Sequence, residues 1–400
     1  MISLPASLSH PWPRRRDFRR LGNYGVGVLS ECLRGPMRVW ARRKCGGVAP
    51  SDPREWRRGL IIGPSHIGDV LYNTASLPAL RAGLPDCRWT YAASGAAVEV
   101  LRGNPCLDEV VAFEESNTFF DFMAHLRPAL ASRQFDVVLT YATSAWRELF
   151  FAALHGIPNR VGYVYKGFSG IVTHPVAIRV PQPFPAYFRD LVCQLTGAPF
   201  ESIRSLRPHV YPTAAHEEAV EAFRARVGFD WNGPPILACS VTSRQPSGIW
   251  PKERFLEAIL QVRQQVRCTV IYLGSEADAG DLRELAERTG SGTHVLAGEL
   301  DLASVVMLLR RCRAALTADS GGRHLANAAG LPVVFVRNIL FRHEEAGAYC
   351  ETDHDMAPPD LEWVPPGQQA EAFARISPAV VAERVASLLS AHGGGAGKMV

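Results

Sequence analysis

The sequence has no uninterrupted apolar run of the roughly 18 residues that a membrane-spanning helix needs. It also lacks C-x-x-C pairs, because its nine cysteines are scattered along the chain. An odd, scattered set gives no disulfide framework and no zinc-binding pattern, so we expect reduced thiols. The N-terminus lacks a basic start followed directly by an apolar segment, which argues against a secretory signal. We therefore expect a cytoplasmic protein.

The composition is that of an ordinary globular chain, with 47% hydrophobic and 20% charged residues. These values exclude a disordered chain, a collagen-like fibre and a coiled coil. The length of 400 residues suits two domains of ordinary size.

Positive charge is concentrated at the N-terminus. Residues 1–58 hold thirteen Lys and Arg against four Asp and Glu, a formal charge of +9, whereas the remainder carries −5. Basic and aromatic or aliphatic side chains alternate over residues 12–43, which suits an anionic membrane surface. Nucleic acid is the competing partner, and a solvated arm is the simpler alternative. We expect no nucleic acid, since no nucleic-acid motif follows and the body of the chain is acidic.

From residue 59 onward, short apolar runs alternate with stretches of helical period, which indicates βαβ units around buried parallel sheets. The pattern stops over the irregular residues 164–215 and then restarts. The predicted strands are 59–63, 88–93, 109–113, 135–141, 235–241, 268–273, 313–318 and 332–337. The predicted helices are 69–83, 95–103, 119–132, 145–155, 251–266, 276–289, 301–312, 322–329 and 376–390.

We therefore predict an α/β fold with two Rossmann-like domains facing each other across a cleft. The predicted divisions are a basic extension (1–57), an N-terminal Rossmann-like acceptor domain (58–215), a C-terminal Rossmann-like nucleotide-sugar domain (216–375), and a final helix with a tail (376–400). Ligands of such sheets bind where strands end, so the loops that follow strands are the candidate sites.

The first candidate loop, Gly63 to Val70, follows the strand 59–63 and places Asp69 in the first turn of a helix. An acidic residue there can be a helix cap or dipole partner, or it can serve chemistry. The loop is not the G-x-G-x-x-G dinucleotide fingerprint, which argues against a nicotinamide enzyme.

The second candidate loop, Asp319 to Ala326, follows the strand 313–318 and contains Gly321 and Gly322. Two glycines between a strand and a helix leave several N–H groups unpaired at the positive helix end, which suits a diphosphate. Arg323 and His324 can add side-chain donors. An ordinary tight strand–helix turn is the alternative.

Several motifs, in this order, resemble the glycosyltransferase family that includes the ADP-heptose:lipopolysaccharide heptosyltransferases, whose fold is GT-B. The resemblance covers roughly residues 59–390. The motifs are Ser65 to Val70, Leu77-Pro78-Ala79-Leu80, Gly103 to Val110, Phe135 to Val138 with Arg147, Trp250 to Phe255, and Asp319 to Ala326.

The resemblance implies roles for particular residues. Asp69 becomes the general base that activates an acceptor hydroxyl. The acceptor residues are Ser65, Gly68 and Arg147. The donor residues are Thr242, Ser243, Arg244, Glu276 (on the ribose), Leu300, Asp319, Ser320, Gly321, Gly322, Arg323 and His324.

One position departs from the family. A lysine usually stands two residues before the tryptophan and pairs with the donor phosphate, but here that position is Gly248. Arg244, Lys252 or Arg323 would have to replace the cation.

We expect an inverting transferase that moves a heptose from ADP-heptose to a lipopolysaccharide-core-type hydroxyl, at the cytoplasmic membrane face and without a metal or other cofactor. The alternatives are a GT-B transferase with another nucleotide sugar and a small-molecule or protein acceptor, and a silent protein that only binds sugar nucleotide.

Overall fold

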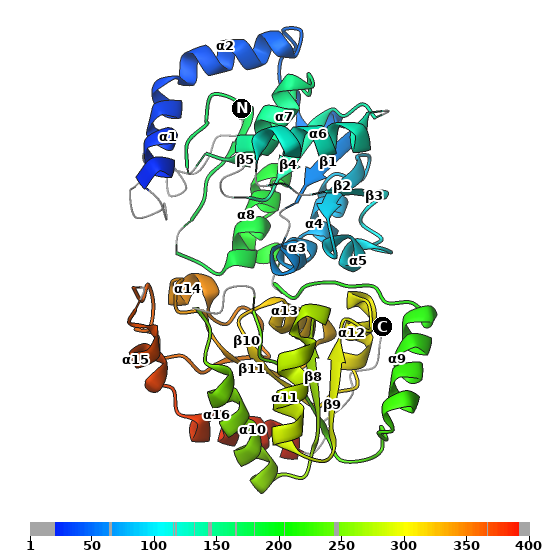
Figure 1. Ribbon diagram of the computed structural model, residues 1–400. Coiled ribbons are helices and arrows are strands. Elements are labelled where there is room, and N and C mark those ends of the chain that lie inside the picture. Colours follow the sequence, from blue (N-terminus) through cyan, green and yellow to red (C-terminus); the bar gives the residue numbers. More distant parts are fainter. Residues whose placement is uncertain are drawn as a thin grey trace. The chain divides into compact units, whose positions relative to one another are not determined.

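A computed structural model describes residues 21–391, apart from residues 64–65, 115, 117, 132, 143–145, 165, 180, 204, 244–247 and 366. The chain forms two compact units that divide between Leu206 and Arg207, shortly before the predicted boundary at residue 215. Figure 1 shows a sheet with helices packed on it in each unit.

Unit 1 (residues 1–206) contains a six-stranded parallel sheet in the order β3-β2-β1-β4-β5-β6. The four predicted strands of this half all form. Three of them are buried almost throughout, as continuous apolar runs require, whereas Glu109–Phe113, at the edge of the sheet, is partly exposed. The strands are β1 (Arg58–Ile62), β2 (Arg88–Ser94), β3 (Glu109–Phe113), β4 (Val137–Thr140), β5 (Asn159–Tyr163) and β6 (His174–Val176).

The predicted helices of unit 1 form with one break, and a further helix, Phe184–Thr196, lies in the segment 164–215 that was expected to be irregular. The single helix expected over residues 69–83 divides at Ala75 and Ser76, because Pro78 has no N–H to donate and stands in the first turn of the second helix. The helices are α3 (Ile67–Thr74), α4 (Leu77–Gly83), α5 (Ala97–Leu101), α6 (Phe119–Leu130), α7 (Trp146–Leu154) and α8 (Phe184–Thr196), with short 3₁₀ turns η3 (Pro53–Glu55) and η4 (Phe200–Ser202).

Two further helices precede the sheet, α1 (Leu21–Cys32) and α2 (Arg34–Lys44). They lie in the part that the sequence assigned to a basic extension. Within the described residues, no helix combines the length and the apolar character needed to cross a bilayer.

Unit 2 (residues 207–400) contains the second six-stranded parallel sheet, in the order β12-β11-β10-β7-β8-β9. The C-terminal helix belongs to this unit, since Val381 and Val385 lie in its core. The strands are β7 (Ile236–Ser240), β8 (Thr269–Gly274), β9 (Thr293–Ala297), β10 (Ala314–Ala318), β11 (Val333–Val336) and β12 (Asp353–Asp355). The helices are α9 (Ala214–Val227), α10 (Lys252–Gln265), α11 (Ala279–Thr289), α12 (Leu302–Leu309), α13 (Gly321–Ala329), α14 (His343–Ala346), α15 (Gln369–Ala374) and α16 (Pro378–Ser390), with the 3₁₀ turn η6 (Glu276–Asp278).

Candidate functional site

The strand order of unit 2 indicates where its sheet would bind a ligand. β7 and β10 are neighbours at the centre of the sheet, and the chain proceeds from them toward opposite edges, to β8 and to β11. Ligands of open α/β sheets bind at the carboxyl ends of the strands at this reversal. Thr242 and Ser243 follow β7, and Asp319 and Ser320 follow β10, so four predicted donor residues come together here. Arg244 lies outside the described residues.

The start of α13 lies against the end of β7. A Cβ atom built on Gly322 would be 2.1 Å from the Ser240 hydroxyl oxygen, so only glycine permits this approach. Ser320 is the N-cap residue of α13, and its side chain makes no capping hydrogen bond among the described residues. The first N–H groups of a nine-residue helix therefore meet the switch point of the sheet, which is the arrangement that binds phosphate elsewhere.

Asp319 holds this loop from inside the protein. Its side chain is only 8% exposed. One carboxylate oxygen accepts a hydrogen bond from Arg323 Nη1 at 2.8 Å, and the other accepts one from the backbone N–H of Asn338 at 3.3 Å. This aspartate thus joins the loops that follow β10 and β11.

Arg323 is fully buried, and its guanidinium is engaged on several sides. It donates to Asp319 and to Asp353, each at 2.8 Å, and to the backbone oxygens of residues 346 and 347. Its guanidinium carbon lies 3.4 Å from the centre of the Phe335 ring. The expectation that Arg323 reaches the donor phosphates is at odds with this burial. The placement assigns it to the support of the loop instead.

His324 is buried beside Arg323. Its Nδ1 is 2.7 Å from the hydroxyl oxygen of Tyr349. Burial, with a smaller contribution from the Arg323 charge, holds the pKa of His324 well below 6.5. The imidazole is therefore neutral at pH 7, and it can bind a ligand by hydrogen bonds but contributes no charge.

The position of the family's lysine has no room for a side chain. A Cβ atom on Gly248 would meet the Asn338 side-chain oxygen at 2.4 Å. Asn338 itself is buried, and its side-chain oxygen accepts the backbone N–H of Leu340 at 3.0 Å. The backbone N–H of Ile339 donates to the Gly248 oxygen at 3.3 Å. Asn338 thus packs where the lysine would start.

Asn338 and Tyr349 are residues that the sequence analysis missed. Asn338 comes two residues after the end of β11, on the same sheet edge as Asp319, so its place after a buried strand was an available signal. Tyr349 lies beyond α14 in an irregular segment, and no sequence spacing relates it to His324.

Glu276 and Leu300 lie beyond the next two strands of the sheet. β8 and β9 end in register, with Gly274 paired to Ala297. The backbone N–H of Gly298 donates to the Gly274 oxygen at 3.1 Å, and a Cβ atom on Gly298 would be 2.9 Å from that of Glu276. The exposed Glu276 thus lies against Gly298, two residues before the half-buried Leu300, and the assignment of both residues to the donor stays a prediction.

In unit 1, Asp69 occupies the first turn of α3, where it is half-buried beside Gly68. Burial raises the pKa of the Tyr91 hydroxyl, and the charge of Asp69 adds a smaller effect in the same direction. The Tyr91 hydroxyl accepts a hydrogen bond from Asn73 Nδ2 at 2.7 Å. Its oxygen would be 2.3 Å from a Cβ atom on Gly63, so the loop after β1 lies directly on the tyrosine. Ser65 falls outside the described residues.

Arg147, at the start of α7, is held toward α6. Its Nη1 donates to the backbone oxygen of Ser116 at 2.9 Å, and its guanidinium lies 5.0 Å from the centre of the Phe122 ring. The side chain remains 27% exposed. Its predicted contact with an acceptor stays a prediction.

No group of three or more His, Cys, Asp or Glu that could hold a metal ion occurs within the described residues. The expectation of metal-independent chemistry likewise stays a prediction.

Comparison with known proteins identifies the family to which the chain is similar. The family model described as "Glycosyltransferase family 9 (heptosyltransferase)" matches residues 123–336, more than half of the chain. Lipopolysaccharide heptosyltransferase 2 of Escherichia coli K12 is 24% identical over 293 residues, which cover 69% of this chain and 81% of the relative. Lipooligosaccharide heptosyltransferase 2 of Haemophilus influenzae is 22% identical over 290 residues, with the same shares.

Solved structures show the same fold. A glycosyltransferase of family 9 from Veillonella parvula superimposes with a TM-score of 0.71 at 18% identity, covering 85% of this chain and 99% of that one. The E. coli ADP-heptose lipopolysaccharide heptosyltransferase II superimposes with a TM-score of 0.65 at 19% identity, covering 83% and 98%. These matches confirm the predicted α/β fold of GT-B type. Because the family model matches more than half of the chain, the chain belongs to glycosyltransferase family 9 and is a glycosyltransferase.

Proposed function

We propose that this enzyme transfers a heptose from ADP-heptose to a sugar hydroxyl of a lipopolysaccharide-core-type glycolipid, with inversion at the sugar's anomeric carbon. The names of the relatives supply the donor and the acceptor class. The observation that carries the proposal is the start of α13, where Gly322 lies against Ser240 at the switch point of unit 2. This helix end is a site for a nucleotide diphosphate.

The proposed reaction is a single displacement. Asp69 takes the proton of the acceptor hydroxyl. The hydroxyl oxygen bonds to the anomeric carbon of the donor sugar while the bond from that carbon to the diphosphate oxygen breaks. A positioned general base contributes roughly 10²–10⁴-fold. N–H groups of α13 stabilise the charge that develops on the departing ADP, and fixed donors at such a position are often worth more than the base.

The remaining donor contacts follow from the loops that meet on this sheet edge. Glu276 is the carboxylate assigned to the ribose hydroxyls, and Thr242, Ser243 and Ser320 offer hydroxyls near the diphosphate. Neutral His324, held by Tyr349, adds a hydrogen-bonding nitrogen. Asp319 and Arg323 do not contact the donor in this proposal but support the loop that binds it, because both are buried and paired with each other.

A transferase that uses another nucleotide sugar, with a small-molecule or protein acceptor, is the second candidate. One observation favours it: Asn338 fills the space at Gly248, where the family's phosphate-binding lysine would begin. A protein that only binds sugar nucleotide is less favoured, because the Asp69 turn and the α13 turn are both formed.

The acceptor class places the reaction at a membrane surface. We propose that the enzyme works in the cytoplasm, peripherally at the inner membrane, since the glycolipid acceptor is part of a bilayer. No nucleic-acid partner is invoked.

Transfer assays test the proposal directly. Purified enzyme is incubated with a heptose-deficient core glycolipid and, in separate reactions, ADP-heptose, ADP-glucose, UDP-glucose and GDP-mannose. The proposal predicts a product one heptose heavier with ADP-heptose alone, with inverted anomeric configuration and no loss of rate in EDTA. Transfer from another nucleotide sugar in preference would establish the second candidate, and donor binding without transfer to any acceptor would establish the third.

A further inference from the structure

The helix α1 has its apolar side chains on the outside. Val26 and Leu29 of α1, and Leu33 directly after it, are 53%, 58% and 46% exposed, whereas Gly27 and Ser30 are buried against the segment Gly167–Phe168. A surface helix of a globular protein ordinarily shows the opposite arrangement. Six of the eleven large hydrophobic side chains that are exposed among the described residues lie between Leu21 and Val48. Such a concentration marks a contact surface.

The pair α1–α2 is attached firmly by its inner face. Glu31 accepts hydrogen bonds from the backbone N–H and the hydroxyl of Ser169, at 2.8 and 2.6 Å. The Trp40 ring lies 4.9 Å from that of Phe150, and Ala41 is fully buried in the same cluster. The outer face is thus held in a fixed orientation on the rest of unit 1, where Figure 1 shows α1 along the left edge and α2 across the top.

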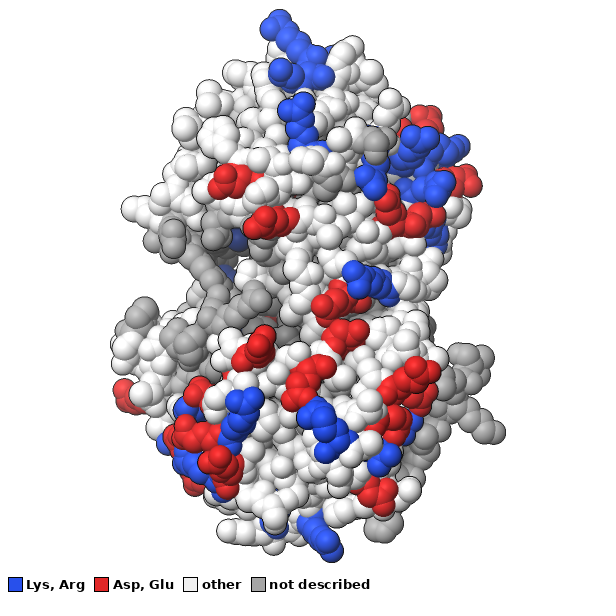
Figure 2. Space-filling view, turned by 45° about the vertical axis from the view of Figure 1, so that its right-hand side comes forward, with Lys and Arg blue, Asp and Glu red and all other residues white. Residues whose placement is uncertain are grey.

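The outer face of α2 adds positive charge to this apolar surface. The exposed cations between Leu21 and Val48 are Arg34, Arg38, Arg42, Arg43 and Lys44. The one acidic residue in this stretch, Glu31, is turned inward to Ser169. No ion pair joins any of the five cations to a carboxylate within the described residues. Figure 2 shows basic side chains at the top of the molecule, at the height where α2 lies in Figure 1, with the visible acidic side chains lower.

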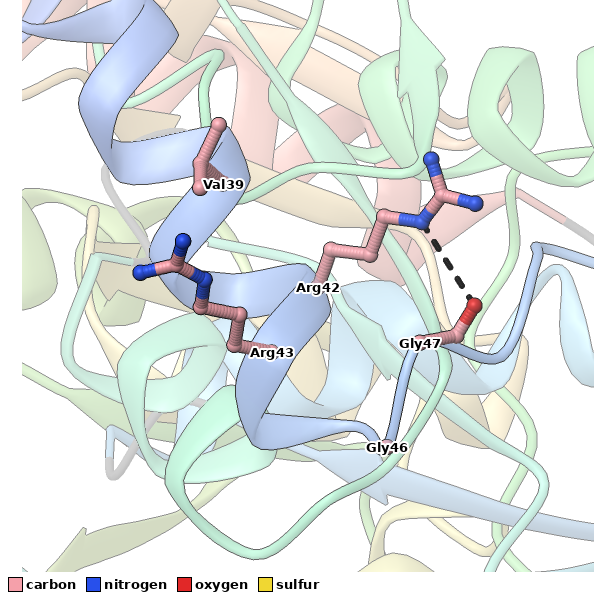
Figure 3. A pocket seen from close by; sticks show the side chains of 5 residues that line it. All are labelled: Val39, Arg42, Arg43, Gly46 and Gly47. Atoms are coloured by element: carbon pink, nitrogen blue, oxygen red, sulfur yellow. Dashed lines mark hydrogen bonds between the residues drawn. The ribbon is translucent and has the colours of Figure 1, made fainter.

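A shallow open hollow at the end of α2 shows how the cations are arranged. It is lined by Val39, Arg42, Arg43, Gly46 and Gly47. In Figure 3 the guanidinium groups of Arg42 and Arg43 point to opposite sides of the helix end, and Arg42 Nε contacts the Gly47 oxygen at 3.5 Å. Cations that diverge cannot enclose one small anion. They suit a surface on which several phosphates lie side by side.

We propose that the outer face of α1–α2 binds the surface of an anionic phospholipid bilayer, with Val26, Leu29 and Val39 entering the headgroup boundary and the α2 arginines on lipid phosphates. Apolar side chains flanked by cations are the combination that interfacial helices use. A nucleic acid would leave the aliphatic side chains of α1 without contacts. A second copy of the chain docked on the same surface would place its five cations opposite these five, and the like charges would repel each other.

The proposal deepens the peripheral location given under Proposed function, but its test is independent of catalysis. Full-length protein is floated with vesicles of phosphatidylcholine alone and with vesicles of equal parts phosphatidylcholine and phosphatidylglycerol. We expect binding to the second kind only, weakened by salt. Arg38→Gln with Arg43→Gln should lower the vesicle partition coefficient by roughly 30-fold, since each cation contributes about 1 kcal/mol near such a surface. Val26→Ser with Leu29→Ser should also lower it.

Matched controls are available in unit 2. Arg267→Gln with Arg283→Gln removes two other exposed cations, and Val380→Ser with Leu260→Ser removes two other exposed apolar side chains. All variants are required to keep the wild-type melting temperature. Equal loss of vesicle binding in the unit 2 pairs would overturn the proposal. So would unchanged binding in the α1–α2 pairs, tighter binding to duplex DNA than to vesicles, full competition by inorganic phosphate, or a dimer that Leu29→Ser dissociates.

The outcome is separable from the transferase assignment. Transfer to a water-soluble acceptor fragment should proceed at wild-type rate in the α1–α2 variants. An enzyme that transfers no sugar but binds anionic vesicles through Leu29 and Arg38 would overturn the proposed function and leave the membrane surface standing.

Discussion

Replacement of Arg323 by methionine separates a loop-supporting arginine from a phosphate-binding one. Methionine keeps much of the volume above Phe335 but removes the charge that Asp319 and Asp353 share. The Asp353 side chain is fully buried, and that of Asp319 nearly so. Removal of one partner from a buried ion pair costs about 3–5 kcal/mol, because the remaining charge is left uncompensated. We therefore expect the free energy of unfolding to fall by about that amount.

Urea denaturation followed by tryptophan fluorescence measures this change, since Trp250 lies in the core of unit 2. Arg288→Met is the control. Arg288 pairs with Glu253 and Glu284 on the surface, where solvent screens the interaction, so the unfolding free energy should barely change. The double variant Arg323→Met/Asp353→Asn should recover part of the loss. A variant as stable as wild type that has lost donor affinity would refute the structural role and restore Arg323 as a phosphate ligand.

Three further outcomes follow from the site. Gly322→Ala should weaken the binding of ADP, measured by calorimetry, because the added Cβ atom meets the Ser240 hydroxyl. Adding Ser240→Gly to that variant should restore part of the affinity. Undiminished binding by Gly322→Ala would show that the start of α13 is not fixed against Ser240. Gly248→Lys should weaken rather than tighten donor binding, because Asn338 occupies the space; tighter binding would mean that the lysine site is open. Stability should fall as the pH drops below 6.5, because unfolded His324 binds a proton that the folded side chain does not. His324→Gln should flatten this dependence in denaturation midpoints measured from pH 7 to 5, and an unchanged slope would assign it to other groups.

The sequence predicted the sheets well where strands are continuous apolar runs. β4 and β10 are fully buried, and both were located to within a few residues. It missed β5, β6, β9 and β12. The residues of β12 are Asp-His-Asp. These residues form a strand because Asp353 pairs with Arg323 and Asp355 with Arg337, a cause that only the tertiary structure supplies.

The sequence predicted the backbone turns of the candidate site better than the directions of its side chains. Glycines and strand ends located the α13 turn, because close approach and sheet topology leave a trace in the sequence. The direction of the Arg323 side chain leaves none. A cation three residues after Ser320 has the same spacing whether it points to a ligand or, as here, into the core toward Asp353.

The N-terminal helices illustrate a similar limit. Charge and aromatic content over residues 12–43 predicted a surface partner, and the cluster Arg14, Arg15, Arg16, Arg19 and Arg20 lies outside the described residues. The docking of α1 on Ser169 could not be predicted, because it depends on residues that are distant in sequence.

The measurement that tests the account most directly is the turnover of Asp69→Asn with saturating ADP-heptose and acceptor, together with its donor dissociation constant. Asparagine keeps the size of the side chain and its place in the first turn of α3 but cannot take the acceptor's proton. We predict a loss of turnover of at least about 100-fold, with donor affinity changed only a few-fold. Turnover near the wild-type rate in that variant would contradict it and leave Asp69 as a residue of the helix start.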